Sequence, residues 1–415
     1  MQVDAMWEIS NQDAEPSRPR RICIILGSRA EYGLLKWVIH DLQNDVRVDA
    51  MVVLTATLAD DGFASFGEVR DDHLRVASVV ELDWENGTSP PSEWLGQLLT
   101  ELGREFLRLD PDLVLVVGDR METLVAAQTA IVQSIPVAHI HGGELSEGSF
   151  DDSFRHALTK LASLHFPTSE SYARRIQQLG ERPESIFTVG TPGTSSILRG
   201  EVAPLSEVEN RTGLDLSRPY LLVTYHPVTV DRAESIAGAK ALVQALLELS
   251  EFQIILTGTN VDPGAGEVGK ILSNLRLGRR TGIAFVESLG HRQYLSALAH
   301  AAACVGNSSS GLIEAPVVGT PTINIGTRQG GRDRARTVID VPANATAIVN
   351  AIRASSGKRS PVDVTDALAE PHSLDPSRQI AQIVSSVPLT GLRRKTFVDC
   401  GPSCSSWSRE DLVRE

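Results

Sequence analysis

Short apolar runs alternate along most of the chain with longer segments in which apolar residues recur every three or four positions. The short runs predict buried parallel strands, and the spacing in the longer segments predicts amphipathic helices. Strands are expected at residues 21–26, 48–55, 112–118, 137–140, 164–168 and 186–189, and again at 220–225, 252–256, 283–286, 304–306 and 322–325. Polar residues 199–219 separate the two series, so the chain is expected to form two α/β halves that are built alike.

Length and composition narrow the class of protein. A chain of 415 residues is long enough for two domains of ordinary size. No apolar run reaches the length needed to cross a bilayer, so no membrane partner is expected. Asp and Glu outnumber Lys and Arg by 52 to 39, and the formal charge of −13 argues against a nucleic-acid partner. A phosphate site would therefore have to be built from a local cluster of donors.

The cysteines and the first residues bear on the compartment. Cys23, Cys304, Cys400 and Cys404 form neither a disulfide framework nor zinc-ligand spacing, so free thiols in a reducing cytoplasm are the simplest interpretation. Residues 1–20 contain acids and lack the apolar core of a secretory signal. We interpret them as a disordered leader.

The most polar stretch of the chain, H-I-H-G-G-E-L-S-E-G-S-F-D-D-S-F-R-H-A-L-T-K at residues 139–160, directly follows a predicted strand. Its glycine pair frees the backbone to turn, and helical spacing resumes near residue 151. Glu144, Asp151, Asp152 and His156 are thus expected near the carboxyl ends of the strands, where open α/β sheets bind ligands. A solvated loop followed by a charged helix face is the alternative, but the glycines and histidines favour a site.

A second polar cluster, Asp119, Arg120 and Glu122, follows the strand expected at residues 112–118. Its position suits a site, but an N-cap role for Asp119 fits equally well, since Asp is favoured there. His139 and His141 suggest metal ligands, because alternate residues of a strand point the same way. No third ligand has a recognisable spacing from this pair, so we expect no metal.

A candidate phosphate site precedes a helix of the second series. Asn307, Ser308, Ser309 and Ser310 supply hydroxyl and N–H groups at the start of that helix, as a diphosphate requires, whereas a single N-cap would not need three serines. In the next loop Arg328 or Arg332 could bind phosphate through two hydrogen bonds.

The loop Gly27, Ser28 and Arg29 is a weaker candidate for anion binding at a helix start. It is neither the dinucleotide motif G-x-G-x-x-G nor a Walker A loop. These absences argue against a nicotinamide cofactor and against an ATPase.

Taken together, eight motifs resemble the UDP-N-acetylglucosamine 2-epimerase family, in family order from about residue 21 to residue 387: G-S-R-A-E-Y-G, V-V-G-D-R-M-E-T, H-I-H-G-G-E, D-D-S-F-R-H-A-L-T-K, V-G-T-P-G, T-Y-H-P-V-T, G-N-S-S-S-G-L-I-E-A and G-T-P-T-I-N-I-G-T-R-Q. The resemblance is strongest to the hydrolysing branch, which releases N-acetylmannosamine and UDP. It implies the GT-B architecture, in which two Rossmann-like domains face a central cleft. The domains are then expected at residues 21–200 and 201–374, with a helix at 375–388 that crosses back to the first domain and a tail at 389–415.

The resemblance also implies roles for single residues. Asp119, one of the pair Asp151 and Asp152, and His226 match the family's catalytic positions. Ser308 and Ser309, with Gly311 beside them, would hold the diphosphate, Glu314 the ribose, and Arg29 and Arg328 further parts of the nucleotide, while Arg120, Glu122 and His156 are expected around the substrate. Similar enzymes eliminate UDP across C1 and C2 to give a glycal and then add water or UDP with C2 inverted, which needs proton transfer and stabilisation of the departing UDP. That route uses no metal and no redox cofactor, and the family implies a homodimer or homotetramer.

Several questions stay open. Non-hydrolysing relatives carry Glu where this chain has His141, so either His141 or Glu144 takes over its acid–base or hydroxyl-binding role. Recapture of UDP would give UDP-N-acetylmannosamine instead of the free sugar. The chain could instead be a GT-B glycosyltransferase or a catalytically idle nucleotide-sugar sensor. The sugar is also open, because a 4-amino-4,6-dideoxy variant would need only small changes in the pocket, and so is the aminosugar pathway.

Overall fold

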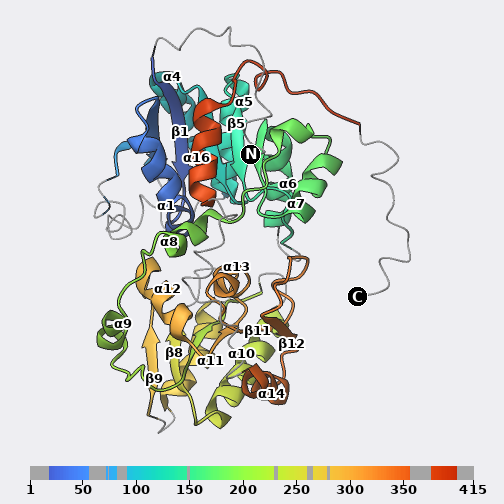
Figure 1. Ribbon diagram of the computed structural model, residues 1–415. Helices are drawn as coiled ribbons and strands as arrows, with labels where there is room; N and C mark the ends of the chain where they lie inside the picture. The colour runs from blue at the N-terminus through green and yellow to red at the C-terminus, as the bar shows by residue number, and fades with distance from the viewer. Residues whose placement is uncertain are drawn as a thin grey trace.

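The computed structural model describes residues 18–55, 72, 74–81, 91–146, 150–228, 232–258, 265–277, 281–355 and 375–399. Within these residues the chain forms two six-stranded parallel sheets, each flanked by helices (Figure 1). The strand order is β3-β2-β1-β4-β5-β6 in the first sheet and β12-β11-β10-β7-β8-β9 in the second. Both orders are the doubly wound Rossmann order, in which the sheet reverses its direction of growth after the third strand. The expected α/β class with two Rossmann-like domains is confirmed.

The N-terminal domain contains the first sheet. Its elements are β1 (Arg20–Leu26), α1 (Arg29–Asn44), β2 (Val48–Leu54), β3 (Val76–Val79), α4 (Pro91–Leu109), β4 (Leu113–Val117), α5 (Met121–Val132), β5 (Val137–Ile140), α6 (Asp151–Leu161), β6 (Leu164–Phe166) and α7 (Glu170–Gln178). The 3-10 turns η1 (Pro183–Ser185) and η2 (Pro192–Thr194) and the short helix α8 (Ser195–Leu198) lead out of it.

The C-terminal domain contains the second sheet. Its elements are α9 (Leu205–Thr212), β7 (Tyr220–Thr224), α10 (Arg232–Glu248), β8 (Gln253–Thr257), α11 (Ala265–Leu277), β9 (Ile283–Val286), α12 (Gly290–His300), β10 (Ala303–Gly306), α13 (Ser310–Val317), β11 (Thr322–Ile325), β12 (Val338–Val341) and α14 (Ala345–Ser355). The last helix, α16 (Pro376–Ser386), follows.

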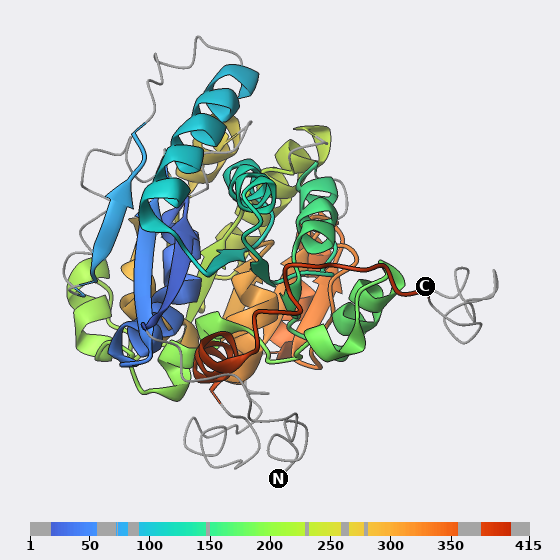
Figure 2. The ribbon, with the colours of Figure 1, turned by 90° about the horizontal axis from the view of Figure 1, so that it is seen from above.

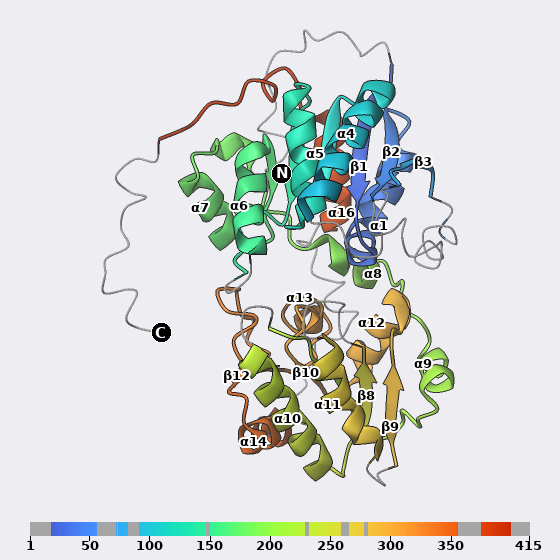
Figure 3. The ribbon, with the colours of Figure 1, turned by 180° about the vertical axis from the view of Figure 1, so that it is seen from behind.

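Side chains that alternate along the strands fill an apolar layer on each face of the first sheet. Ile22 and Ile24 of β1 pack with Leu35 of α1 on one face, and Figure 1 shows α1 and α16 over that face of the sheet. Cys23 and Ile25 pack on the other face with residues of α4 and α5, and Figure 3 shows these two helices over that face from behind. Because every second residue of a strand points to the same face, one run of apolar residues supplies both layers.

Helix α16 comes last in the chain but packs on the N-terminal domain. Ile380 and Val384 belong to the same apolar layer as α1. Arg20 Nη1 donates a hydrogen bond of 2.7 Å to the Val384 carbonyl oxygen, which fixes the end of α16 near the start of β1. Figure 2 shows α16 beside α1 when the molecule is viewed from above.

The structure differs from the pattern at three places. The strand expected at residues 186–189 makes only one bridge, between Ile186 and His165. Strands β3 and β12 were not expected, because they lie at sheet edges and expose part of their side chains, so they lack a continuous apolar run. The polar segment at residues 199–219 contains the helix α9, which ends at Gly213 with a left-handed φ of 70°.

Some expectations concern residues outside the described part of the chain, namely most of the leader, Cys400, Cys404 and the end of the tail. Cys23 and Cys304 are buried and free, as expected. No helix in the described ranges is both long and apolar enough to cross a membrane.

Candidate active site

The candidate site lies where the loops after the strands of one domain meet those of the other. In the N-terminal domain, Asp119 follows β4 and His141 follows β5. In the C-terminal domain, His226 follows β7 and Asn307 follows β10. In both sheets the first and fourth strands are neighbours at the point where the strand order reverses, which is where doubly wound sheets bind ligands.

The glycine pair lets the chain turn sharply after β5. Gly143 has a φ of 76°, and a Cβ atom there would lie 2.5 Å from the Tyr172 carbonyl oxygen, so only glycine fits between the loop and α7. His141 also has a left-handed φ, 66°, which is uncommon for a residue with a side chain. Such a conformation persists where the surroundings enforce it, and it often marks a functional site.

This backbone conformation pairs His141 with Glu144. His141 Nδ1 lies 2.7 Å from Glu144 Oε1, and both side chains are about 6% exposed. The opposite ring nitrogen, Nε2, is buried without a hydrogen-bond partner among the described residues. Because a carboxylate only accepts, Nδ1 carries a proton in this pair, and in the neutral tautomer that this favours the lone pair lies at Nε2.

Glu144 is held as a carboxylate. Burial alone would raise its pKa, but the hydrogen bond from His141 and the positive charges of Arg155 and Arg332 outweigh that effect and hold the pKa well below its usual range. Thr168 Oγ1 also donates to Glu144 Oε1 at 3.0 Å. Of these two residues, His141 is therefore the better candidate for the proton acceptor, since a carboxylate this strongly stabilised is a poor one.

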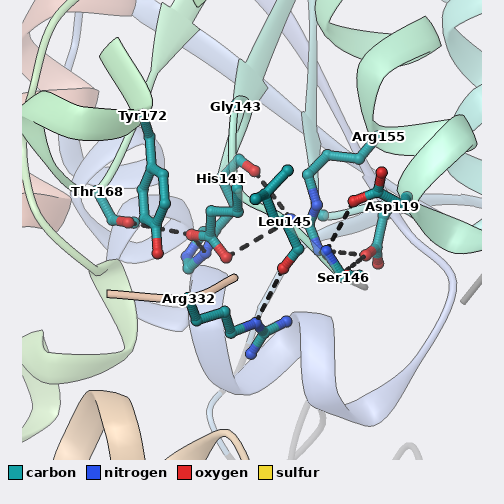
Figure 4. Close-up of polar contacts among 12 residues, drawn as sticks. Asp119, His141, Gly143, Leu145, Ser146, Arg155, Thr168, Tyr172 and Arg332 are labelled. Carbon is teal, nitrogen blue, oxygen red and sulfur yellow. Dashed lines mark hydrogen bonds and ion pairs between the residues drawn. The ribbon is translucent and has the colours of Figure 1, made fainter. Parts of the chain in front are cut away.

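Arg155 of α6 ties the acids of the N-terminal domain together (Figure 4). It is 3% exposed, donates to the His141 carbonyl oxygen at 2.9 Å and lies 3.7 Å from Glu144 Oε2. Its other terminal nitrogen donates to Ser146 Oγ and pairs with Asp119 Oδ2. A buried guanidinium with several partners fixes the relative positions of those partners, because the fork geometry is rigid.

Asp119 is not a helix cap. The N-cap of α5 is Arg120 and makes no side-chain cap hydrogen bond, whereas Asp119 Oδ2 accepts from Arg155 and, at 3.3 Å, from Ser146 Oγ. Its second carboxylate oxygen, Oδ1, makes no hydrogen bond to any described residue. The interpretation of Asp119 as a capping residue is therefore wrong.

The two aspartates at the start of α6 have different surroundings. Asp152 Oδ1 accepts the Ser146 backbone N–H at 2.7 Å, and Oδ2 lies 3.5 Å from His156 Nε2. Asp152 thus holds the site loop in place. Asp151 acts electrostatically on Arg120, which places it on the side of the β4 loop.

A buried carboxyl group lies behind the β1 loop. Glu31 accepts the Gly27 N–H at 2.5 Å and a hydrogen bond from Thr123 at 3.3 Å, and burial raises its pKa to about 7. Arg120 pairs with Glu122 at 3.2 Å. Ser28 caps α1 by accepting the Glu31 N–H, and the helix begins at Arg29, whose side chain lies outside the described residues.

In the C-terminal domain, the side-chain amide of Asn307 binds the backbone of His226. The His226 N–H donates to Asn307 Oδ1 at 2.7 Å, and Asn307 Nδ2 donates to the His226 carbonyl oxygen at 2.8 Å. Arg328 and Gln329 both donate to the Asn307 carbonyl oxygen. The Asn307 amide is therefore occupied in joining loops, whereas the sequence had placed it at the diphosphate. Burial, helped by Arg328, lowers the pKa of the His226 imidazole to about 3, so the ring is neutral at pH 7.

The remaining residues of the N-S-S-S-G motif begin α13. Ser309 is the N-cap residue but makes no side-chain cap hydrogen bond. Close packing requires glycine at position 311, because a Cβ atom there would come within 2.6 Å of Thr322 Cγ2. Burial raises the pKa of the Glu314 carboxyl group.

The structure does not support His139 and His141 as a pair of metal ligands. His139 Nε2 donates to the Gly118 carbonyl oxygen at 2.7 Å, and burial lowers its pKa to about 3. His141 stands outside β5 with a left-handed φ, so strand alternation does not align the two rings.

Sequence reasoning placed Arg155 among the bases near the expected site but gave it no role, and it did not single out Ser146, Thr168 or Gln329. Arg155 carried a signal because it lies four residues after Asp151 on a predicted helix. The other three became visible only in the fold, since their partners are separated from them in sequence.

The chain is similar to known proteins over most of its length. A family model described as UDP-N-acetylglucosamine 2-epimerase matches residues 40–384. The chain is 32% identical over 326 residues to a GDP/UDP-N,N'-diacetylbacillosamine 2-epimerase (hydrolyzing) of Campylobacter jejuni, covering 78% of this chain and 85% of that protein. It is 31% identical to a UDP-N-acetylglucosamine 2-epimerase of Neisseria meningitidis, with coverages of 80% and 87%.

A solved structure supports the same fold. The crystal structure of UDP-GlcNAc 2-epimerase from Neisseria meningitidis bound to UDP-GlcNAc superposes with a TM-score of 0.71 at 17% identity, covering 88% of this chain and 98% of that one. The match of the family model to most of the chain, together with relatives above 30% identity, decides the assignment. This chain belongs to the UDP-N-acetylglucosamine 2-epimerase family.

Proposed function

We propose that the protein converts a UDP-2-acetamido sugar and water into the C2-inverted free sugar and UDP. The expected substrate is UDP-N-acetylglucosamine, and the product is then N-acetylmannosamine. In the first step the C2–H bond breaks, its electron pair forms the C1–C2 double bond, and the C1–O bond pair leaves with UDP. In the second step water adds its oxygen to C1 and C2 receives a proton on the opposite face.

The observation that carries this proposal is the His141–Glu144 pair beside Asp119. Glu144 fixes the imidazole tautomer at Nδ1, which leaves the buried Nε2 as a proton acceptor. Asp119 keeps one carboxylate oxygen that makes no hydrogen bond to a described residue. Two such groups suit a reaction in which one face of C2 loses a proton and the other gains one.

We assign the other N-terminal residues by their contacts. His141 takes the proton from C2. Asp119 supplies the proton that C2 receives in the second step, and Asp151 lies near the loop that carries Asp119. Glu144, Arg155 and Asp152 are positioning residues, since their contacts go to the pair or to the loop that carries it. Arg120, Glu122 and His156 line the substrate side of this network.

The C-terminal domain is assigned to UDP. Ser308, Ser309, Ser310 and Gly311 begin α13, whose N-terminal N–H groups and dipole favour a diphosphate. Arg328 and the neutral His226 lie on loops that hydrogen bonds to Asn307 connect. Glu314 binds the ribose hydroxyls, and Arg29 completes the nucleotide site from the other domain.

The decisive experiment is a proton NMR time course with UDP-N-acetylglucosamine in deuterium oxide. The expected result is free N-acetylmannosamine that carries deuterium at C2, together with UDP. Product without deuterium at C2 would contradict proton abstraction, and UDP-N-acetylmannosamine would show recapture of UDP. Turnover that requires an added alcohol and leaves C2 unexchanged would indicate a glycosyltransferase.

A second sugar has a specific reason to be tested in parallel. The Campylobacter jejuni relative is named for N,N'-diacetylbacillosamine. UDP-N,N'-diacetylbacillosamine should therefore be assayed beside UDP-N-acetylglucosamine, and the larger kcat/KM identifies the substrate. Either outcome places the enzyme in aminosugar biosynthesis.

Location and assembly complete the proposal. Two buried free thiols, Cys23 and Cys304, suit the reducing cytoplasm. We propose a homodimer or homotetramer, which sedimentation of the purified chain would measure.

A further inference from the structure

The loop after β11 joins the two domains through Asp333. Its carboxylate oxygen Oδ2 accepts from Ser169 Oγ at 2.7 Å and from Ser171 Oγ at 2.6 Å, and its backbone N–H donates to Tyr172 Oη at 2.9 Å. Ser169 is the N-cap of α7, so the carboxylate of one domain lies at a helix N-terminus of the other. The helix dipole favours a negative charge there. We call these three contacts the Asp333 clasp.

The preceding residue reaches the candidate active site. Arg332 Nε donates to the Leu145 carbonyl oxygen at 3.4 Å, and Leu145 directly follows Glu144 (Figure 4). The positive charge of Arg332 also contributes to lowering the pKa of Glu144. The clasp and this contact thus fix one short segment at two points of the N-terminal domain.

The guanidinium of Arg332 has N–H groups that donate to no described residue. Among the described residues, no carboxylate forms an ion pair with Arg332, and the Leu145 carbonyl is the partner of its side chain. Arg155 and Arg199 are instead paired with carboxylates. A half-buried guanidinium with unpaired terminal nitrogens beside an active-site loop suits an anionic ligand that binds through two oxygens.

We propose that Arg332 contacts the diphosphate of the nucleotide sugar and that Asp333 is the positioning residue that holds it there. This inference rests on the proposed function. When the C1–O bond breaks, its electron pair adds negative charge to the phosphate oxygens, and Arg332 stabilises that charge without gaining or losing a proton. The clasp joins groups from different domains, so it forms only when the domains are together. Stabilisation of the departing UDP by Arg332 is thereby coupled to closure of the two domains through Asp333.

The expected size of the effect follows from the exposure of the clasp. Asp333 is largely exposed, so its hydrogen bonds contribute little to the stability of the fold. Removing a charge-stabilising donor from an active site costs about 100- to 1000-fold in rate. A donor that is only misplaced by about 1 Å costs up to about 100-fold. Arg332→Ala is therefore expected to lose more activity than Asp333→Ala.

The test is a double-mutant cycle in the full-length protein with Arg332→Ala, Asp333→Ala and both changes together. If Asp333 acts through Arg332, the double variant should have the kcat/KM of Arg332→Ala to within about threefold. Glu248→Ala is the matched control, because it removes an exposed carboxylate paired with Arg353 far from this loop. Additive losses, or an Asp333→Ala variant as active as the control, would overturn the proposal.

A second measurement keeps the clasp separate from the proposed reaction. Small-angle X-ray scattering with saturating UDP should give a smaller radius of gyration for the wild type than for Asp333→Ala. If the wild type turns over no nucleotide sugar but still shows this difference, the reaction is wrong and the clasp is retained. If the wild type is active and the two radii agree, the clasp is wrong and the reaction is retained.

Discussion

Replacing Glu144 by Gln tests the role given to the His141–Glu144 pair. The change keeps the shape of the side chain but removes its charge. The amide oxygen will face the cationic Arg155, 3.7 Å away in the wild type, and the amide nitrogen will then face His141 Nδ1. An amide N–H directed at Nδ1 forces the other tautomer, in which Nε2 carries the proton and cannot accept one.

The magnitude follows from the charge that appears during proton transfer. When His141 accepts a proton, its imidazolium lies beside the Glu144 carboxylate, with Nδ1 and Oε1 2.7 Å apart. Two charges centred roughly 4 Å apart interact by about 4 kcal/mol at an effective dielectric constant of about 20. The expected loss is therefore about 100- to 1000-fold in kcat, since each decade corresponds to about 1.4 kcal/mol.

The assay is kcat and kcat/KM for UDP release between pH 5 and 9, with UDP binding measured by calorimetry as a control for folding. The variant lacks the negative charge that stabilises the imidazolium formed when His141 accepts the proton, so kcat should fall throughout this pH range while UDP still binds. A Glu144→Gln enzyme with wild-type kcat would refute the assignment.

Three further predictions follow from the same contacts. Arg155→Met should lower the free energy of unfolding by about 3–5 kcal/mol in a denaturant titration, because it leaves Glu144 without its buried cation; a loss below about 1 kcal/mol would show that the acids do not depend on Arg155. Gly143→Ala should destabilise the protein and abolish turnover, since φ is 76° and the Tyr172 carbonyl blocks a Cβ atom, whereas Gly266→Ala, with open space around it, should fold normally. Glu31→Gln should gain stability relative to the wild type by roughly 3 kcal/mol as pH rises from about 4.5 to 7, because the folded pKa of Glu31 is about 7 and the unfolded chain releases its proton first; parallel stability curves would contradict that pKa.

The order of elements could be predicted from the sequence, because the burial of a strand or helix produces a characteristic local pattern of apolar residues. A parallel strand such as β4 must be apolar throughout, and a helix such as α6 must show its 3.6-residue period, so both were expected at nearly their observed positions. Strands β3 and β12 have no continuous apolar run, because several of their side chains are exposed. Polar residues directly after strands likewise predicted where the site would lie.

What the residues do within the site depended on the tertiary structure. From the sequence, Asp119 could be either a helix N-cap or a site residue, and either His141 or Glu144 could be the acid–base group, because each choice depends on which side chain lies opposite. The ion pair with Arg155, which comes from a later helix, shows that Asp119 is not a cap. The left-handed backbone that pairs His141 with Glu144 favours His141 as the proton acceptor. Periodicity reports which face of an element is buried, whereas hydrogen-bond partners distant in sequence are set only when the chain has folded.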